Sequence, residues 1–218
     1  DTFAVDNPEG LALSADERYL YVGTFGYAGD SAYNLEMRDA QSGARVTGVN
    51  FAHPAPYGRA GSDIQGLSLT PDGAALYAAS VDADGIFVVD PATLMPQGMI
   101  PTQALARFFP LRAALSPDGA TLYVGGGVET PTTVSVVDTA SMAVVDQMRD
   151  ERAGACRSGS FGLALSPDGA TLYALASDCN ALLAFDTTNR APLDSLDVGT
   201  PGIPLTHAAV HPDGDRVY

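Results

Sequence analysis

The chain repeats one pattern of apolar and polar positions along most of its length. Apolar residues alternate with small or polar ones, a turn of the Pro-Asp-Gly type follows, and the alternation resumes toward a tyrosine. A period of two is typical of a half-buried strand, and Pro-Asp-Gly supplies a fixed φ, a side-chain acceptor and a residue that tolerates positive φ. Each copy therefore predicts a β-hairpin. The copies are residues 11–21, 67–77, 113–123, 163–173 and 208–218.

A second apolar segment follows each of the first four hairpins and ends in an aspartate. Turn-forming residues come next, and then a shorter apolar segment such as residues 143–148. Four strands in each period of about 45 to 55 residues, with no helical pattern of useful length, predict the four-stranded antiparallel blade of a β-propeller. The segments that end in aspartate are residues 35–39, 86–90, 134–138 and 182–186.

The repeat also divides the chain into blades. We expect an all-β fold, with residues 1–218 forming a single partial β-propeller domain of about four and a half blades. A ring closed by this chain alone would leave strand edges open, so we expect a part of a six- to eight-bladed ring, or a ring completed by a second copy. The complete blades are expected at about residues 10–65, 66–111, 112–161 and 162–206, and the partial ones at 1–9 and 207–218.

These motifs resemble the YVTN-type repeat of YncE-like β-propellers, and the resemblance extends from about residue 10 to the end. It implies an extracytoplasmic binding or scaffold protein, a surface-layer component or an oxidoreductase subunit. The first copy departs from the family pattern, because residues 15–17 read Ala-Asp-Glu in place of Pro-Asp-Gly. Arg38 also stands where the family strand is apolar. We therefore expect the first blade to lie differently from the others.

The charge limits the classes of partner. The formal net charge is −15, from 26 acidic residues against 11 basic ones, all of which are arginine. Nucleic acid and acidic membrane surfaces are unfavourable partners, because both require clustered positive charge. Apolar runs are also much shorter than the roughly 18 residues that a membrane span requires, so we expect no membrane insertion.

The two cysteines, Cys156 and Cys179, lie at nearly equal distances on either side of the turn in the fourth hairpin. Antiparallel pairing of that hairpin would bring them close enough for a disulfide. Two unrelated thiols are the alternative. A disulfide would indicate a periplasmic or extracellular protein.

Candidate binding residues follow from the propeller geometry. In this fold the first strand of each blade lines the central channel, and the long, irregular connections share one face. The residues six positions before each turn aspartate would then form a ring at the channel mouth. They are Gly10, Gly66, Arg112, Gly162 and His207. Arg112 and His207 could bind an anionic ligand, with a salt bridge and a structural hydrogen bond as their respective alternatives.

Three further candidates, His53, Arg59 and Arg157, come from the long connections. The sequence has no nucleophile elbow, phosphate loop, zinc-protease motif or haem-attachment motif, so we predict no catalytic residue, no metal site and no cofactor. We expect a binding or scaffold module that presents its loop face to a protein, a polysaccharide or a small ligand. The alternative is a propeller enzyme or an oxidoreductase subunit, such as a lactonase-like hydrolase or a periplasmic quinoprotein dehydrogenase subunit.

Overall fold

The described part of the chain consists of strands and turns. In the computed structural model it comprises residues 5, 7–24, 33–51, 63–81, 83, 85–102, 110–126, 133–150, 160–176, 179–198 and 206–218. No helix long and apolar enough to cross a membrane occurs in these residues. The chain divides into two compact units, unit 1 (Asp1–Thr102) and unit 2 (Gln103–Tyr218). We describe each unit by itself.

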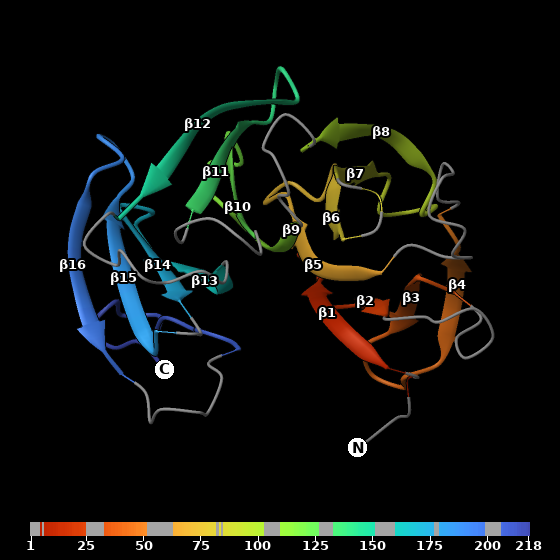
Figure 1. Ribbon diagram of the computed structural model, residues 1–218. Coiled ribbons are helices and arrows are strands. Elements are labelled where there is room, and N and C mark those ends of the chain that lie inside the picture. The colour runs from red at the N-terminus through yellow and green to blue at the C-terminus, as the bar shows by residue number, and fades with distance from the viewer. Residues whose placement is uncertain are drawn as a thin grey trace. The chain divides into compact units, whose positions relative to one another are not determined.

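Unit 1 contains two four-stranded antiparallel sheets, each with its strands paired in chain order (Figure 1). The first strands of the two sheets, β1 and β5, pack against each other. The first sheet is β1 (Pro8–Leu13), β2 (Tyr19–Thr24), β3 (Leu35–Asp39) and β4 (Arg45–Val49), and the second is β5 (Ile64–Leu69), β6 (Leu76–Ser80), β7 (Gly85–Val89) and β8 (Pro96–Pro101).

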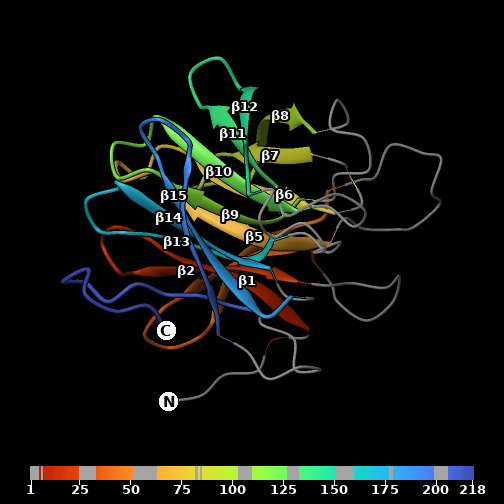
Figure 2. The same cartoon turned by 60° about the vertical axis from the view of Figure 1, so that its left-hand side comes forward.

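Unit 2 has the same organisation, with β9 packed against β13 (Figure 2). Its sheets are β9 (Pro110–Leu115), β10 (Thr121–Gly126), β11 (Thr133–Asp138) and β12 (Ala143–Arg149), followed by β13 (Ser160–Leu165), β14 (Thr171–Ala176), β15 (Ala181–Asp186) and β16 (Pro192–Asp197). Sheets of four antiparallel strands in meander order are β-propeller blades, so the predicted fold class is confirmed.

Local turn chemistry explains why each hairpin closes at its aspartate. In the third hairpin the Ser116 hydroxyl donates to Asp118 Oδ1 at 2.6 Å and accepts the Thr121 N–H at 2.9 Å. Asp118 Oδ1 also accepts the Ala120 N–H at 3.0 Å. Gly119 has a φ of 74°, which side chains disfavour. The Ser-Pro-Asp-Gly motif thus satisfies its own polar groups, as the sequence predicts.

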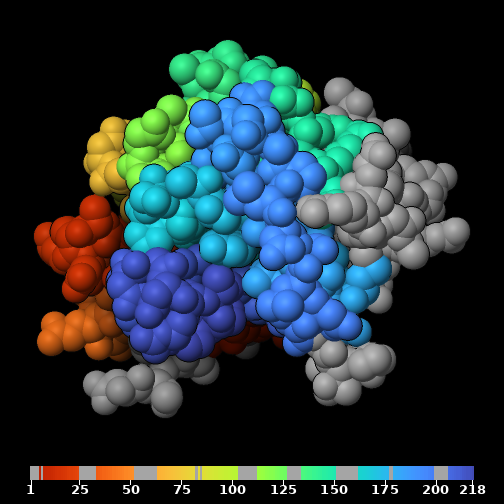
Figure 3. All heavy atoms as spheres, turned by 90° about the vertical axis from the view of Figure 1, so that its left-hand side faces the viewer, coloured from red at the N-terminus to blue at the C-terminus, as the bar shows by residue number. Residues whose placement is uncertain are grey.

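Burial is greatest in the middle of each sheet and falls toward its last strand. Every residue of β6 is buried, whereas every residue of β16 is exposed, and Figure 3 shows β16 at the surface of unit 2. Each unit has its own apolar cluster between its two blades. The cluster in unit 1 includes Tyr21, Leu35, Met37, Ile64 and Leu76, and that in unit 2 includes Tyr123, Val134, Met148, Leu172 and Phe185.

The first blade pairs its strands in the same order and register as the others, contrary to our expectation. Tyr21 lies opposite Met37, as Tyr123 lies opposite Val136 in the third blade. Glu17 adopts the left-handed conformation that glycine has in the other copies, with a φ of 58°. The strand also tolerates Arg38, because Glu36 lies 2.7 Å from its Nη2.

The last hairpin, in residues 206–218, forms as predicted but is short. A single antiparallel bridge joins Val210 to Val217. The His211 N–H donates to the Arg216 carbonyl, and the Gly214 N–H donates back to the His211 carbonyl, both at 2.8 Å.

Candidate functional site

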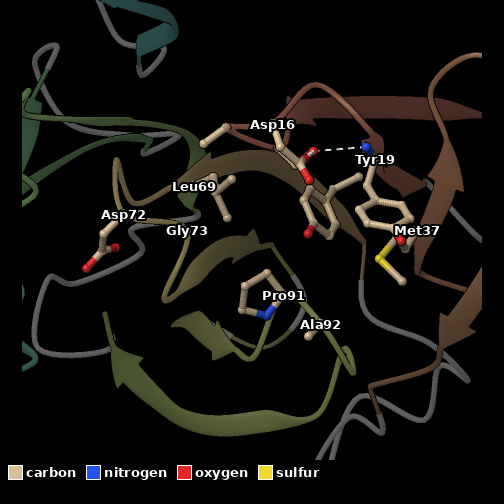
Figure 4. Close-up of a pocket in the computed structure, with 11 residues that line it drawn as sticks. Asp16, Tyr19, Met37, Leu69, Asp72, Gly73, Pro91 and Ala92 are labelled. Atoms are coloured by element: carbon tan, nitrogen blue, oxygen red, sulfur yellow. Dashed lines mark hydrogen bonds between the residues drawn. The ribbon is translucent and has the colours of Figure 1, made fainter.

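A groove of about 390 Å³ opens between the two blades of unit 1, at the end where their hairpin turns lie (Figure 4). This volume lies in the range of small-molecule pockets. The unit 1 groove is lined by Ser14, Ala15, Asp16, Tyr19, Tyr21, Met37, Leu69, Asp72, Gly73, Pro91 and Ala92. Its lining contains no histidine, cysteine, arginine or lysine among the described residues. In Figure 4, Met37 and Leu69 flank the space, and Asp72 lies at its edge with its carboxylate directed away from Pro91.

The groove coincides with one departure from the repeat, at Ala15. In unit 2, Pro117 stands at the corresponding position and packs against the turn glycine of the next blade, where a Cβ on Gly169 would lie 2.7 Å from its Cδ. Ala15 has no ring to fill this space, and a Cβ on Gly73 would meet nothing within 4 Å. The loss of the proline thus leaves open a position that a neighbouring blade otherwise covers.

A second departure, at Pro91, removes a hydrogen-bond partner from the groove. In unit 2 the Thr187 side chain hydrogen-bonds the hydroxyl of Tyr123 on the adjacent blade, and Thr187 also donates to the Gly169 carbonyl at 2.7 Å. Pro91 stands where Thr187 does, so Tyr21, the counterpart of Tyr123, has no such partner. Tyr21 is 4% exposed, and its hydroxyl forms no hydrogen bond to any residue that the structure describes.

The carboxylates at the groove are held in their charged form. A hydrogen bond from the Ser14 hydroxyl, and after it one from the Arg18 N–H, hold the pKa of Asp16 below its ordinary value of 3.8. The Thr70 side chain is the largest cause that lowers the pKa of Asp72 in the same way. Hydrogen bonds to the charged form favour that form, so both groups are anionic at neutral pH.

The negative charge of the carboxylates also affects the pKa of the Tyr21 hydroxyl. Burial raises the pKa of its hydroxyl above the ordinary 10.0, and the negative charges of Asp16 and Asp90 raise that pKa further. One positive group offsets part of this potential, because the Arg18 guanidinium lies 5.5 Å from the centroid of the Tyr19 ring. The side chains that line the groove therefore carry a net negative charge.

Unit 2 has a smaller groove of about 300 Å³ between its last complete blade and the final hairpin. Here the proline is retained, and a Cβ on Gly214 would lie 3.6 Å from Pro167 Cδ. The lining is Ser166, Pro167, Asp168, Thr171, Tyr173, Asp213 and Gly214. It repeats the turn motif and offers little apolar surface of its own.

The final hairpin also brings His211, Asp213 and Asp215 together, with ligand atoms within 4.8 Å of one another. Turn chemistry accounts for this cluster. His211 stands at the serine position, and its Nδ1 lies 2.5 Å from Asp213 Oδ1, as the serine hydroxyl does in other copies. Asp215 is held by Arg216, whose Nε lies 3.1 Å from Oδ1.

The two predicted channel-mouth residues have different surroundings. Arg112 is half-buried in β9, opposite Gly125. His207 is exposed, with Nδ1 3.1 Å from the Thr206 hydroxyl oxygen. Its backbone lies against the neighbouring blade, because a Cβ on Gly162 would be 3.2 Å from the His207 carbonyl carbon. The ring of mouth positions is therefore contiguous at Gly162 and His207, and a ligand role for Arg112 and His207 stays a prediction.

The remaining predicted residues fall largely outside the described part of the chain. His53, Arg59, Arg157 and Cys156 all lie there. Cys179 is described, is half-buried and is in a disulfide. Because Cys156 is not among the described residues, the pairing of the two cysteines stays a prediction.

Comparison with known proteins relates the chain to others by fold. No model of a known protein family matches it, and no curated protein does. The chain is similar to a solved structure of Kuenenia stuttgartiensis hydrazine synthase, with a TM-score of 0.70 and 20% sequence identity. The match covers 100% of this chain and 56% of that one, so the chain spans about half the length of its structural relative. At this identity the likeness shows the fold alone.

Proposed function

We propose that this chain is a non-catalytic β-propeller binding module that holds a small ligand in the unit 1 groove. The observation that carries the proposal is the Tyr21 side chain, which is 4% exposed, lines the groove and has a hydroxyl that forms no hydrogen bond to the described residues. A hydrogen bond between a ligand and this hydroxyl would contribute about 0.5–1.5 kcal/mol to binding.

The two departures from the repeat support the same proposal. Ala15 opens the space and Pro91 removes the threonine that would occupy the Tyr21 hydroxyl. Together the two substitutions remove the ring and the hydrogen-bond partner that occupy the corresponding positions in unit 2.

Restoring the repeat tests the proposal. We expect protein-observed NMR with a library of neutral, cationic and anionic fragments to give shifts at Tyr21 and Met37. The double variant Ala15→Pro, Pro91→Thr fills the groove, and those shifts should disappear. Pro117→Ala, which removes the corresponding ring in unit 2, is the matched control and should leave binding at Tyr21 unchanged. No fragment shifts at Tyr21 in the natural chain, or equal shifts in the double variant, would overturn the proposal.

We further propose that the chain is an extracytoplasmic YVTN-type repeat protein and that Cys156 forms a disulfide with Cys179. The five hairpin copies and the absence of a free thiol at Cys179 support this. Disulfides persist in oxidising compartments, so the pairing favours the periplasm or the cell exterior. Peptide mapping without reductant tests the pairing, and two unlinked cysteine peptides would refute it.

An enzyme subunit is the second candidate, because the solved structure that the chain resembles bears the name of an enzyme, hydrazine synthase. Arg112 and His207 are then the proposed site at the channel mouth. Absorption spectra and metal analysis of the chain purified from its native source would distinguish the two candidates. A bound cofactor or metal favours the enzyme subunit, and loss of that group on Arg112→Ala or His207→Ala would locate it.

A further inference from the structure

The charge and shape of the unit 1 groove indicate which ligand class it takes, if it binds as proposed above. Asp16 and Asp72 are the two carboxylates of the groove lining, and both are exposed to solvent. Asp72 is at the rim. The lining provides no positive side chain to neutralise either group, among the residues described, and Arg18 stacks on Tyr19.

One oxygen of Asp16 remains able to accept a hydrogen bond. The Ser14 hydroxyl donates to Oδ1 at 2.6 Å, and the Arg18 N–H donates to the same oxygen at 3.1 Å. Within the described residues nothing donates to Oδ2. A carboxylate oxygen is an acceptor only, so its partner must be a donor such as an ammonium or guanidinium group.

The rest of the lining is apolar and has a phenol within it. Met37 (5% exposed), Tyr21 (4% exposed), the buried Pro91 and the half-buried Leu69 belong to this lining. Such a surface favours an apolar body, and the face of a tyrosine ring also attracts a cation.

We infer that the unit 1 groove binds a small amphipathic cation, in which an ammonium or guanidinium group is attached to an apolar, planar body. This inference rests on the proposed binding function. The cationic group donates to Asp16 Oδ2 and to the Tyr21 hydroxyl oxygen, and the body packs against Met37, Leu69 and Pro91. The net charge of −15 further favours the approach of a cation over that of an anion.

Three probes of similar shape separate charge from shape: 2-phenylethylammonium, 2-phenylethanol and phenylacetate. Affinities are measured by titration, with resonances of Tyr21 and Met37 as the reporters. We expect the ammonium to bind about fivefold more tightly than the alcohol, because a charge-assisted hydrogen bond is stronger than a neutral one. Phenylacetate should bind more weakly than both. The preference should decrease as salt is raised from 20 mM to about 500 mM.

Asp16→Asn is the decisive variant, because asparagine keeps an oxygen that can accept from Ser14 and Arg18 while the charge is lost. It should abolish the preference for the ammonium and leave the alcohol affinity within about twofold. Asp118→Asn makes the same change at the same turn position in unit 2 and should alter neither affinity. Amide spectra of both variants that match the natural chain outside the substituted turn establish that they fold.

The outcomes separate this inference from the function on which it rests. Equal binding of ammonium and alcohol, or an ammonium preference that survives Asp16→Asn, would refute the cation specificity and leave the binding module intact. No binding of any of the three probes at Tyr21, combined with no hit in the fragment library, would refute the binding module itself. Tight binding of an arginine-containing peptide but not of 2-phenylethylammonium would also refute the small-molecule inference.

Discussion

Replacing Gly73 by alanine isolates the energetic contribution of the turn conformation. Gly73 has a φ of 70°, and a Cβ at this position would meet nothing within 4 Å. Gly169 has nearly the same φ, 73°, but its Cβ would lie 2.7 Å from Pro117 Cδ. The two substitutions therefore share the backbone strain and differ only in the steric clash.

The magnitude follows from these two contributions. A side chain in the left-handed region costs about 1–2 kcal/mol, and alanine offsets about 0.4–1 kcal/mol of this by restricting the unfolded chain. Gly73→Ala should thus lower the free energy of unfolding by about 1 kcal/mol. Gly169→Ala should lower it by about 1–3 kcal/mol more, because crowding at Pro117 adds to the strain. Glu17, with a φ of 58°, already bears the strain, so Glu17→Gly should raise the free energy of unfolding by about 1 kcal/mol.

Urea unfolding at neutral pH measures the change in stability of each of the three variants. Amide hydrogen exchange then assigns that change to unit 1 or unit 2. Equal decreases in the free energy of unfolding for Gly73→Ala and Gly169→Ala would refute a steric clash with Pro117. A decrease in the free energy of unfolding for Glu17→Gly would refute backbone strain at Glu17.

Two further predictions concern polar side chains. The Ser166 hydroxyl is the main cause that holds the pKa of Asp168 below 3.8, so this aspartate stabilises the fold fully above about pH 4 and less as the pH falls through its folded pKa. Ser166→Ala should weaken that dependence in an acid titration of stability, and an unchanged titration would contradict the assignment. Glu36→Gln should lower the free energy of unfolding by about 3 kcal/mol in urea, because the side chain of Arg38, only 13% exposed, would lose its buried counter-charge. A loss below about 1 kcal/mol would show that this ion pair contributes little.

The hairpins could be predicted from sequence because their turn chemistry is local. Ser116 and Asp118 find their partners within five residues, so reading the motif is enough to place the turn. The first hairpin is the exception, because Ala-Asp-Glu replaces Pro-Asp-Gly at residues 15–17. Glu17 adopts the glycine conformation despite its side chain, and the strands on both sides of the turn pair regularly from Leu13 opposite Leu20 to Gly10 opposite Gly23.

The groove could not be predicted in the same way, although its signals are in the sequence. Ala15 is visible as a departure from the repeat, and Pro91 as the one proline at the position of Thr187. Their effect depends on two residues of different blades that face the same space, which requires the packing of one sheet on another. The propeller pattern instead points to Arg112, His207 and the long connections, and most residues of those connections lie outside the described part of the chain.

The self-contained turns leave the surfaces between neighbouring blades free to diverge. The Ser116 and Asp118 hydrogen bonds stay inside the third hairpin, so exchanging Pro117 leaves them intact. Exchanging Thr187 removes only its own hydrogen bonds to Gly169 and Ala170 in the fourth hairpin. A cavity could accordingly be transplanted: Pro117→Ala with Thr187→Pro would copy the unit 1 arrangement into unit 2 and release the Tyr123 phenol. In such an architecture, two substitutions at the contact between neighbouring blades can create a new pocket. No new loop is required, and the strands keep their pairing.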